Sequence, residues 1–109
     1  MPRAGDVVLT DFVGATGVKR RPAVVVSTDL YHEHHPDVVL SVLTSQLRGA
    51  TTPTDYVLQD WPEAGLHAPS AFRAYMGTYA ASAVKVVGHL SGRDWQAVQA
   101  RLKRAVAVP

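Results

Sequence analysis

The chain has 109 residues, 47% of them hydrophobic and 18% charged, with eleven Lys and Arg against nine Asp and Glu and no cysteine. These values suit one globular domain with a modest core. They exclude disulfide frameworks and thiol catalysis, and the net charge of +2 is too small by itself to indicate a nucleic-acid partner. No window approaches the roughly 18 apolar residues of a membrane span, and the N-terminus lacks the apolar core of a secretory signal, so we expect a cytoplasmic protein without membrane contact.

The first half of the chain is predicted to form strands. Residues 5–13 alternate partly between apolar and polar side chains, and a loop with two glycines over 14–18 leads to a second strand at about 22–27. A polar connection over 28–36 can contain a helical turn, and it leads to a mostly apolar strand over 37–44.

The second half is predicted to contain two longer strands. Residues 70–80 and 82–90 have the composition of strands, with Gly77 and Gly88 as bends or bulges. Before them the sequence predicts a turn over 49–53, a short strand from Tyr56, and a compact turn or short helix over 60–66 that buries Trp61.

A C-terminal amphipathic helix is predicted from about Ser91, because this serine is a good N-cap and Asp94 supplies an acidic first turn. The apolar residues that follow at helical spacing are Trp95, Val98, Leu102 and Val106. The cations of this helix are predicted to form a solvated face. Many short strands with one helix indicate a small α+β domain, mainly β, with a strongly bent sheet or barrel.

Three consecutive cations, Lys19, Arg20 and Arg21, come directly before Pro22 and a Val-rich strand. The proline fixes its own φ and disfavours the helical region for Arg21, so Arg21 is expected to be extended at the mouth of that strand. A guanidinium held there could bind a phosphate through two parallel hydrogen bonds. From these residues alone, a solvated basic turn is the simpler interpretation.

The order and spacing of these segments resemble the MazF/PemK family of toxins. The matching segments are Gly5–Val8, Lys19–Ser27, Leu43–Gln46, Ser70 and Gly88–Ser91, so the resemblance covers about residues 5–106. It implies a ribosome-independent endoribonuclease, the toxin of a type II toxin–antitoxin pair, with an SH3-like barrel in a single domain over residues 1–109. It also implies a homodimer, with single-stranded RNA as substrate, a cognate antitoxin as partner and no cofactor.

Within this resemblance Arg21 and Thr44 stand at the family's two catalytic positions, and Lys19, Arg20 and Ser70 are expected as second-rank contacts to RNA. Taken alone, Thr44 is more simply a strand-end residue that bonds to nearby backbone. RNA can cleave itself when its 2′-hydroxyl attacks the neighbouring phosphate, which requires orientation and charge stabilisation but no metal. A guanidinium and a hydroxyl can stabilise that charge, whereas an arginine, whose ordinary pKa exceeds about 12, is a poor general base.

Residues 14–20 and 71–80 depart from the family pattern where it usually lines the groove that reads bases, so the RNA sequence preference does not carry over. Two other functions stay open for the same fold. One is a protein-binding toxin that poisons DNA gyrase, and the other is a catalytically degenerate member that only binds an antitoxin or nucleic acid. Convergence of Arg21 and Thr44 on one groove distinguishes the nuclease from the gyrase poison.

Three histidines, His32, His34 and His35, occupy the polar connection before the third strand. Imidazole is a common metal ligand, but no His-x-x-x-His pair, cysteine or paired carboxylate accompanies them, which favours a polar surface loop and no metal site. A role as acid or base in RNA cleavage is the alternative, because imidazole titrates near neutral pH. The sequence leaves the role of these histidines open.

Overall fold

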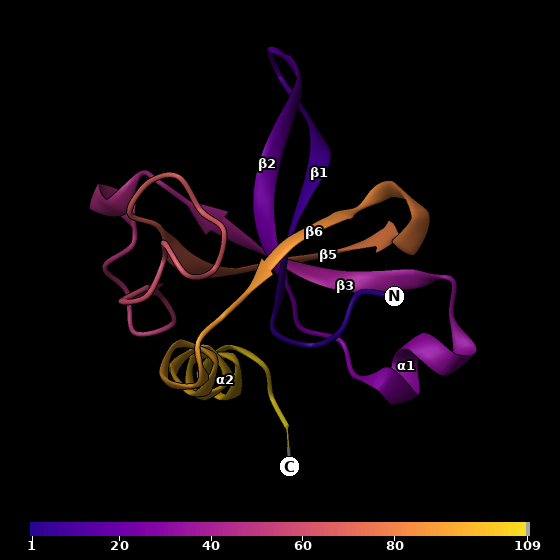
Figure 1. Ribbon diagram of the computed structural model, residues 1–109. Helices are drawn as coiled ribbons and strands as arrows, with labels where there is room; N and C mark the ends of the chain where they lie inside the picture. Colours follow the sequence, from indigo (N-terminus) through magenta and orange to yellow (C-terminus); the bar gives the residue numbers. More distant parts are fainter. Residues whose placement is uncertain (109) are drawn as a thin grey trace.

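Figure 1 shows a computed structural model of the chain, in which residues 1–108 are described. Its elements are β1 (Asp6–Gly14), β2 (Gly17–Val25), α1 (Asp29–His34), β3 (Asp37–Thr44), β4 (Tyr56–Val57), β5 (Ala71–Ala80), β6 (Lys85–His89) and α2 (Gly92–Ala105), with 3₁₀ turns at Leu47–Gly49 and Ala81–Ala83. The strands form one six-stranded antiparallel sheet in the order β4-β5-β3-β2-β1-β6.

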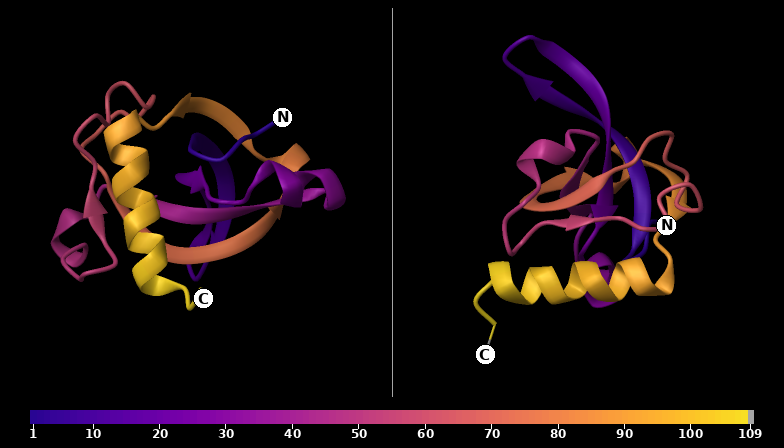
Figure 2. Two further views of the ribbon diagram at one scale, coloured as in Figure 1. Left: turned by 90° about the horizontal axis from the view of Figure 1, so that it is seen from below. Right: turned by 90° about the vertical axis from the view of Figure 1, so that its left-hand side faces the viewer.

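The sheet curls into a half-barrel (Figure 1). Helix α2 lies across one opening of the half-barrel, and the β1–β2 hairpin projects on the opposite side (Figure 2). This architecture confirms the predicted mainly β fold, with an SH3-like curled sheet and a C-terminal helix. Within residues 1–108, no helix combines the length and the apolarity needed to cross a membrane.

The β1–β2 hairpin is longer than the sequence predicts. Strand β2 begins at Gly17 rather than at about residue 22, because its ladder with β1 continues to the pair formed with Gly14. The predicted loop over 14–18 is therefore wrong, since cross-strand pairing outweighs the loop signal of the two glycines and leaves a two-residue turn. As a consequence, residues 19–21 lie within a strand.

The other predicted strands agree with the structure apart from one bend and the start of the last strand, which begins at Lys85, after a 3₁₀ turn, and not at residue 82. Strand β3 spans Asp37–Thr44, as predicted, and Gly88 lies beside a β-bulge in the β1–β6 ladder, also as predicted. Gly77 is not a bend, because it pairs in register with Leu40 and the irregularity in that ladder lies nearer the end of β3. The polar connection contains helix α1.

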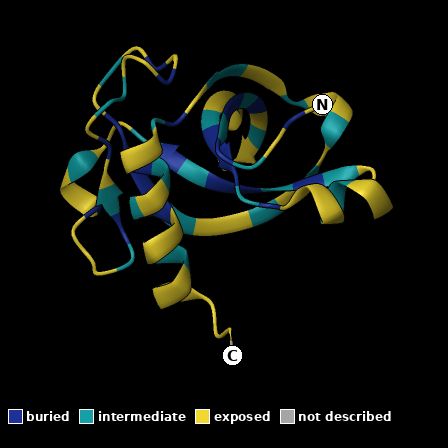
Figure 3. Cartoon of the chain, turned by 60° about the horizontal axis from the view of Figure 1, so that its bottom comes forward, coloured by how far each residue is buried: buried dark blue, intermediate teal, exposed yellow. Residues whose placement is uncertain are grey.

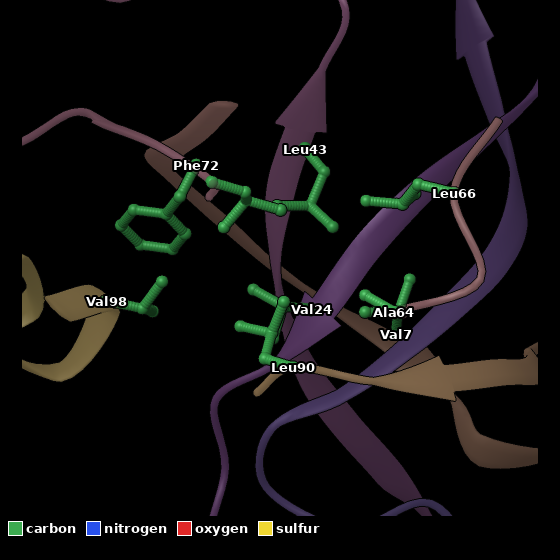
Figure 4. Packing of buried hydrophobic residues seen from close by; sticks show 9 residues of the cluster. Val7, Val24, Leu43, Ala64, Leu66, Phe72, Leu90 and Val98 are labelled. Carbon is green, nitrogen blue, oxygen red and sulfur yellow. The ribbon is translucent and has the colours of Figure 1, made fainter. Parts of the chain in front are cut away.

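The sheet has an apolar cluster on each face. Val7 and Val24 belong to the cluster that packs against α2, whereas their neighbours Val8 and Val25 belong to the other cluster, as the two-residue period of a strand requires. Figure 4 shows the larger cluster. Its buried members are Val7, Val24, Leu43, Leu58, Ala64, Leu66, Phe72, Leu90 and Val98. Trp61 packs against this cluster and is partly buried, so the prediction that the turn over 60–66 buries it is confirmed only in part.

Helix α2 begins with the predicted cap, in which the Ser91 hydroxyl accepts a hydrogen bond from the Asp94 N–H at 3.3 Å. The outer side of α2 and most of α1 are exposed (Figure 3). The cations of α2 are nevertheless more than a solvated face. Arg93 and Arg104 donate hydrogen bonds to the segment 53–60, so they hold the helix against the connection that precedes β5.

A buried carboxylate joins α2 to the same connection. Asp94 is fully buried, and its Oδ1 accepts hydrogen bonds from the Tyr56 hydroxyl at 2.7 Å and the Gln59 N–H at 3.1 Å. Its Oδ2 accepts from the Asp60 N–H at 2.8 Å. These donors compensate the cost of removing the carboxylate from water. Asp94 therefore fixes the backbone at the start of the loop that leads to β5.

Replacing this carboxylate should be costly. In Asp94→Ala, the three donors lose their acceptor inside the protein, so we expect the free energy of unfolding to fall by about 3 kcal/mol. Urea unfolding at one fixed protein concentration measures the change. The control is Gln96→Ala, an exposed position on the same helix, which should stay within about 0.5 kcal/mol of the parent. A loss below about 1 kcal/mol in Asp94→Ala would contradict the assigned role.

Candidate functional site

Arg21 and Thr44 face one pocket from neighbouring strands. Ala23 of β2 pairs with Val42 of β3, and this antiparallel register continued by two residues sets Arg21 opposite Thr44. Both residues line an open pocket of about 470 Å³. The other lining residues are Leu9, Pro22, Leu43, Ser45, Gly65, Leu66, His67, Ala68, Ser70 and Val87.

The pocket opens where β2 and β3 separate. Just beyond β2, the Val26 N–H donates to the Val39 carbonyl of β3 at 3.0 Å. Because backbone polar groups alternate in direction along a strand, the residues two and four positions before Val26 also direct theirs toward β3. Pro22 occupies such a position and has no N–H, which ends the ladder. Arg21 and Thr44 are therefore on adjacent strands without being joined by backbone hydrogen bonds.

Both side chains can donate hydrogen bonds to a bound anion. Thr44 Oγ1 accepts a bond from the Gln46 N–H at 3.1 Å, which is the local backbone contact considered from the sequence. Because a hydroxyl has one hydrogen and two lone pairs, this contact leaves the O–H free to donate. Arg21 is exposed, and no carboxylate among residues 1–108 forms an ion pair with it. Its guanidinium is thus available to an external anion.

The other three predicted contact residues are placed differently. Lys19 lies on the same face of β2 as Arg21 and shares with it a smaller hollow at the hairpin. Arg20 points to the opposite face and lies 3.4 Å from Asp11 across the hairpin. Ser70 lines the pocket, but its side chain is buried and its hydroxyl donates to a backbone carbonyl two residues earlier, at 2.9 Å. The structure therefore gathers Arg21, Thr44 and Ser70 at one pocket and leaves Lys19 and Arg20 outside it.

The loop over residues 58–70 forms part of the pocket wall, and glycine allows it to pack closely on β6. Gly65 has φ of +83°, a conformation that L side chains rarely adopt, and a Cβ there would overlap the Val87 carbonyl. A Cβ at Gly88 would overlap the Ala64 carbonyl. Backbone therefore lies against backbone at both contacts, and this fixes the position of the wall.

Side chains hold the same loop at two further points. Leu66 is buried in the cluster that contains Leu43, as Figure 4 shows. Asp60 accepts hydrogen bonds of 2.6 Å from the Arg93 Nε and from the Ser91 hydroxyl, and a second bond of 2.6 Å from the Arg93 Nη2. These bonds lower the pKa of Asp60 to about 2, so the carboxylate stays ionised well into acidic solution.

The sequence analysis missed His67, which is exposed and lines the pocket. Arg21 and His67 are the two lining residues with ionisable side chains. A lone histidine between Leu66 and Ala68 matches no motif. The signal that could have identified it was its position three residues before Ser70, which the family resemblance had already placed at the groove.

The three histidines singled out from the sequence lie elsewhere. They belong to α1 or follow it directly, at the opposite end of β3 from Thr44, and an eight-residue strand separates its ends by roughly 23 Å. His32 has a largely buried ring whose Nε2 lies 2.6 Å from the Ser27 hydroxyl, and His35 stacks on Tyr31 with ring centroids 4.3 Å apart. Over residues 1–108, no group of three or more His, Asp or Glu side chains is arranged to hold a metal ion.

The curled six-stranded antiparallel sheet with a C-terminal helix is the fold of the class of toxins that the sequence resembles. The sequence profile of the PemK-like, MazF-like toxins of type II toxin–antitoxin systems matches residues 3–106, and the chain belongs to this family. No curated protein sequence matches the chain at a significant level.

Solved structures share the fold at low sequence identity. An endoribonuclease in complex with its cognate antitoxin, from a mycobacterial species, superposes with a TM-score of 0.80 and 21% identity, covering 100% of this chain and 98% of its own. MazF in a MazE–MazF structure from Deinococcus radiodurans gives 0.74 and 21%, with coverages of 95% and 94%. The Mycobacterium tuberculosis toxin MazF-mt6 gives 0.73 and 17%, with coverages of 92% and 94%.

The backbone contact at Gly88 yields a prediction about the pocket wall. Gly88→Ala forces the Ala64 carbonyl and the rest of the loop away from β6, so we expect a loss of about 2–3 kcal/mol in unfolding free energy. Backbone amide chemical shifts of residues 61–68 should also change. Gly92→Ala is the matched control, because a Cβ there meets no atom within 4 Å and alanine favours a helix. Equal stability of the two variants would contradict the contact.

Proposed function

We propose that this protein is the toxin of a type II toxin–antitoxin system and acts as a metal-independent, ribosome-independent endoribonuclease on single-stranded RNA, chiefly messenger RNA. The observation that carries the proposal is the placement of Arg21 and Thr44 on one face of two adjacent strands, lining a single pocket. The family membership supports the reaction class, and the structural similarity to a mycobacterial endoribonuclease supports it further.

In the proposed mechanism, the RNA 2′-hydroxyl attacks the adjacent phosphate and gives a cyclic phosphate and a free 5′-hydroxyl. Arg21 donates two parallel hydrogen bonds to the phosphate oxygens, and the Thr44 hydroxyl donates a third. These donors bind the extra negative charge of the pentacoordinate phosphorane more strongly than the ground-state phosphate, so they lower the barrier. Arg21 acts through its fixed positive charge and not as a base.

The remaining predicted contacts are assigned to binding of the RNA strand. Lys19 is near Arg21 on the same face of β2, so it is suited to a phosphate next to the scissile one. For Arg20, the partial pairing with Asp11 competes with RNA, and we propose a weaker contact there. The Ser70 hydroxyl donates to the Ala68 carbonyl and so holds the loop that forms the pocket wall. We propose that Ser70 contacts the RNA only by van der Waals contact.

We further propose that the protein works in the cytoplasm as a homodimer and is inhibited by a cognate antitoxin, with residues 1–109 acting as one toxin domain. One structural neighbour is described as bound to its cognate antitoxin and another as MazE–MazF, which supports a similar partner for this chain. An extended antitoxin segment with anionic side chains would compete with RNA phosphates for Arg21.

RNA cleavage in the presence of a chelator tests this function. Purified protein is incubated with a long RNA in EDTA, and the new ends are mapped. We expect discrete cuts with 5′-hydroxyl ends, and a loss of at least about 100-fold in rate for Arg21→Ala, because a charge donor to the transition state is removed. Thr44→Val should also lower the rate strongly, and Thr44→Ser, which keeps the hydroxyl, should recover much of it.

The matched control is Arg3→Ala, which removes an exposed arginine beside α1 and should cleave like the parent. Intact RNA together with growth arrest on expression would contradict the nuclease and favour the gyrase poison. Intact RNA without growth arrest would favour a degenerate member of the family. Cleavage that persists in Arg21→Ala would place the active site elsewhere.

A further inference from the structure

We propose that His67 is a further catalytic residue, the general acid that protonates the leaving 5′-oxygen when RNA is cleaved. The inference rests on the proposed endoribonuclease function. It adds the proton transfer that Arg21 and Thr44 leave unassigned.

The reaction requires one proton to leave and another to arrive. A bond forms between the 2′-oxygen and phosphorus while the bond between phosphorus and the 5′-oxygen breaks. The 2′-hydroxyl proton passes to solvent, and the 5′-oxygen, which departs with the bonding electron pair, must gain a proton to become a hydroxyl. An alkoxide is a poor leaving group, so a group that holds a proton near neutral pH and can release it accelerates bond breaking by about 10²–10⁴-fold.

The chemistry of the other lining residues leaves this task to His67. Arginine holds its proton too strongly to donate it at neutral pH. The Thr44 hydroxyl is a far weaker acid than an imidazolium, and the Ser70 hydroxyl already donates to the Ala68 carbonyl at 2.9 Å. The remaining ionisable side chain at the pocket is His67, and imidazole is the side chain that ordinarily changes its charge between pH 5 and 8.

The backbone around His67 is fixed although its side chain is exposed. On one side, Leu66 is buried and its N–H donates to the Trp61 carbonyl at 3.3 Å. On the other side, the Ala68 carbonyl accepts the Ser70 hydroxyl. A histidine between two anchored residues stays at the pocket rim, and its ring can still reach a substrate. This is how an acid on a loop keeps a constant distance from the scissile phosphate.

The charges around the pocket favour protonation of His67 when RNA is bound. Strands β1, β2, β3 and β6 contribute lining residues, and Arg21 is the only charged side chain among them. A phosphate bound in the pocket beside His67 attracts an imidazolium ion and so favours the protonated form of the ring.

A substrate with a sulfur leaving group tests the assignment. Once the cut site is mapped, a short RNA is made with the scissile 5′-oxygen or with sulfur in its place, since a thiolate leaves without protonation. On the oxygen substrate, His67→Gln should reduce the single-turnover rate by about 100-fold or more. On the sulfur substrate, His67→Gln should come within about threefold of the parent. The control His34→Gln changes an exposed histidine on α1 and should leave both rates unchanged.

The pH profile gives a second readout. With the oxygen substrate, the slope of log rate against pH should decrease by one as pH rises through the histidine titration in the parent, and this decrease should be absent in His67→Gln. Thermal unfolding and circular dichroism verify that the variant is folded, as expected for an exposed side chain.

Each other outcome overturns the assignment. Equal losses on the oxygen and sulfur substrates would make His67 a binding or positioning residue. Unchanged rates in His67→Gln, with Arg21→Ala inactive, would remove His67 from the mechanism while the proposed nuclease stands. A parent protein that cuts no RNA would remove both.

Discussion

The end of the β2–β3 ladder at Pro22 is the constraint on which the pocket depends. Up to Ala23 the two strands are held about 4.8 Å apart by backbone hydrogen bonds, which leaves no room for a phosphate between them. Beyond that point the missing N–H lets the strands separate. The pleat still directs Arg21 and Thr44 to the same face, because the register is fixed by the paired residues of β2 and β3 on the other side of Pro22. Pro22 thus ends the hydrogen bonding between β2 and β3 while Arg21 and Thr44 stay opposite each other.

A pocket also needs a second wall, and its position depends on contacts far from the strands. The buried Asp94 carboxylate binds the backbone where the loop over 58–70 begins, and Gly65 and Gly88 let the same loop touch β6 backbone to backbone. Both kinds of contact resist change. A buried carboxylate that loses its hydrogen-bond donors costs much free energy, and so does displacing a backbone carbonyl to make room for a Cβ. Functional residues on loops work when the scaffold determines where the loop lies.

The parts predicted correctly from the sequence are those governed by local rules. The strand over 37–44 is a run of apolar residues, and the helix from Ser91 has a cap and a clear period, so both follow from neighbouring residues alone. The placement of Arg21 opposite Thr44 followed from the family resemblance. The role of Asp94 and the position of His67 could not be predicted, because both depend on contacts between residues more than twenty positions apart. The early start of β2 was missed since the ladder with β1, and not its own composition, defines that strand.

The distribution of charge explains how a chain with a net charge of only +2 can offer the proposed anion site. Arg20, Arg73 and Arg93 each lie beside an aspartate, so part of the positive charge is already compensated within the fold. Arg21 pairs with no carboxylate in residues 1–108 and stands at a pocket lined mainly by apolar groups. A single guanidinium in such surroundings interacts strongly with a phosphate that displaces water from it, but it provides few contacts along a polyanion. The proposed selectivity for RNA must therefore come from the 2′-hydroxyl that carries out the reaction, and not from the overall attraction between the protein and nucleic acid.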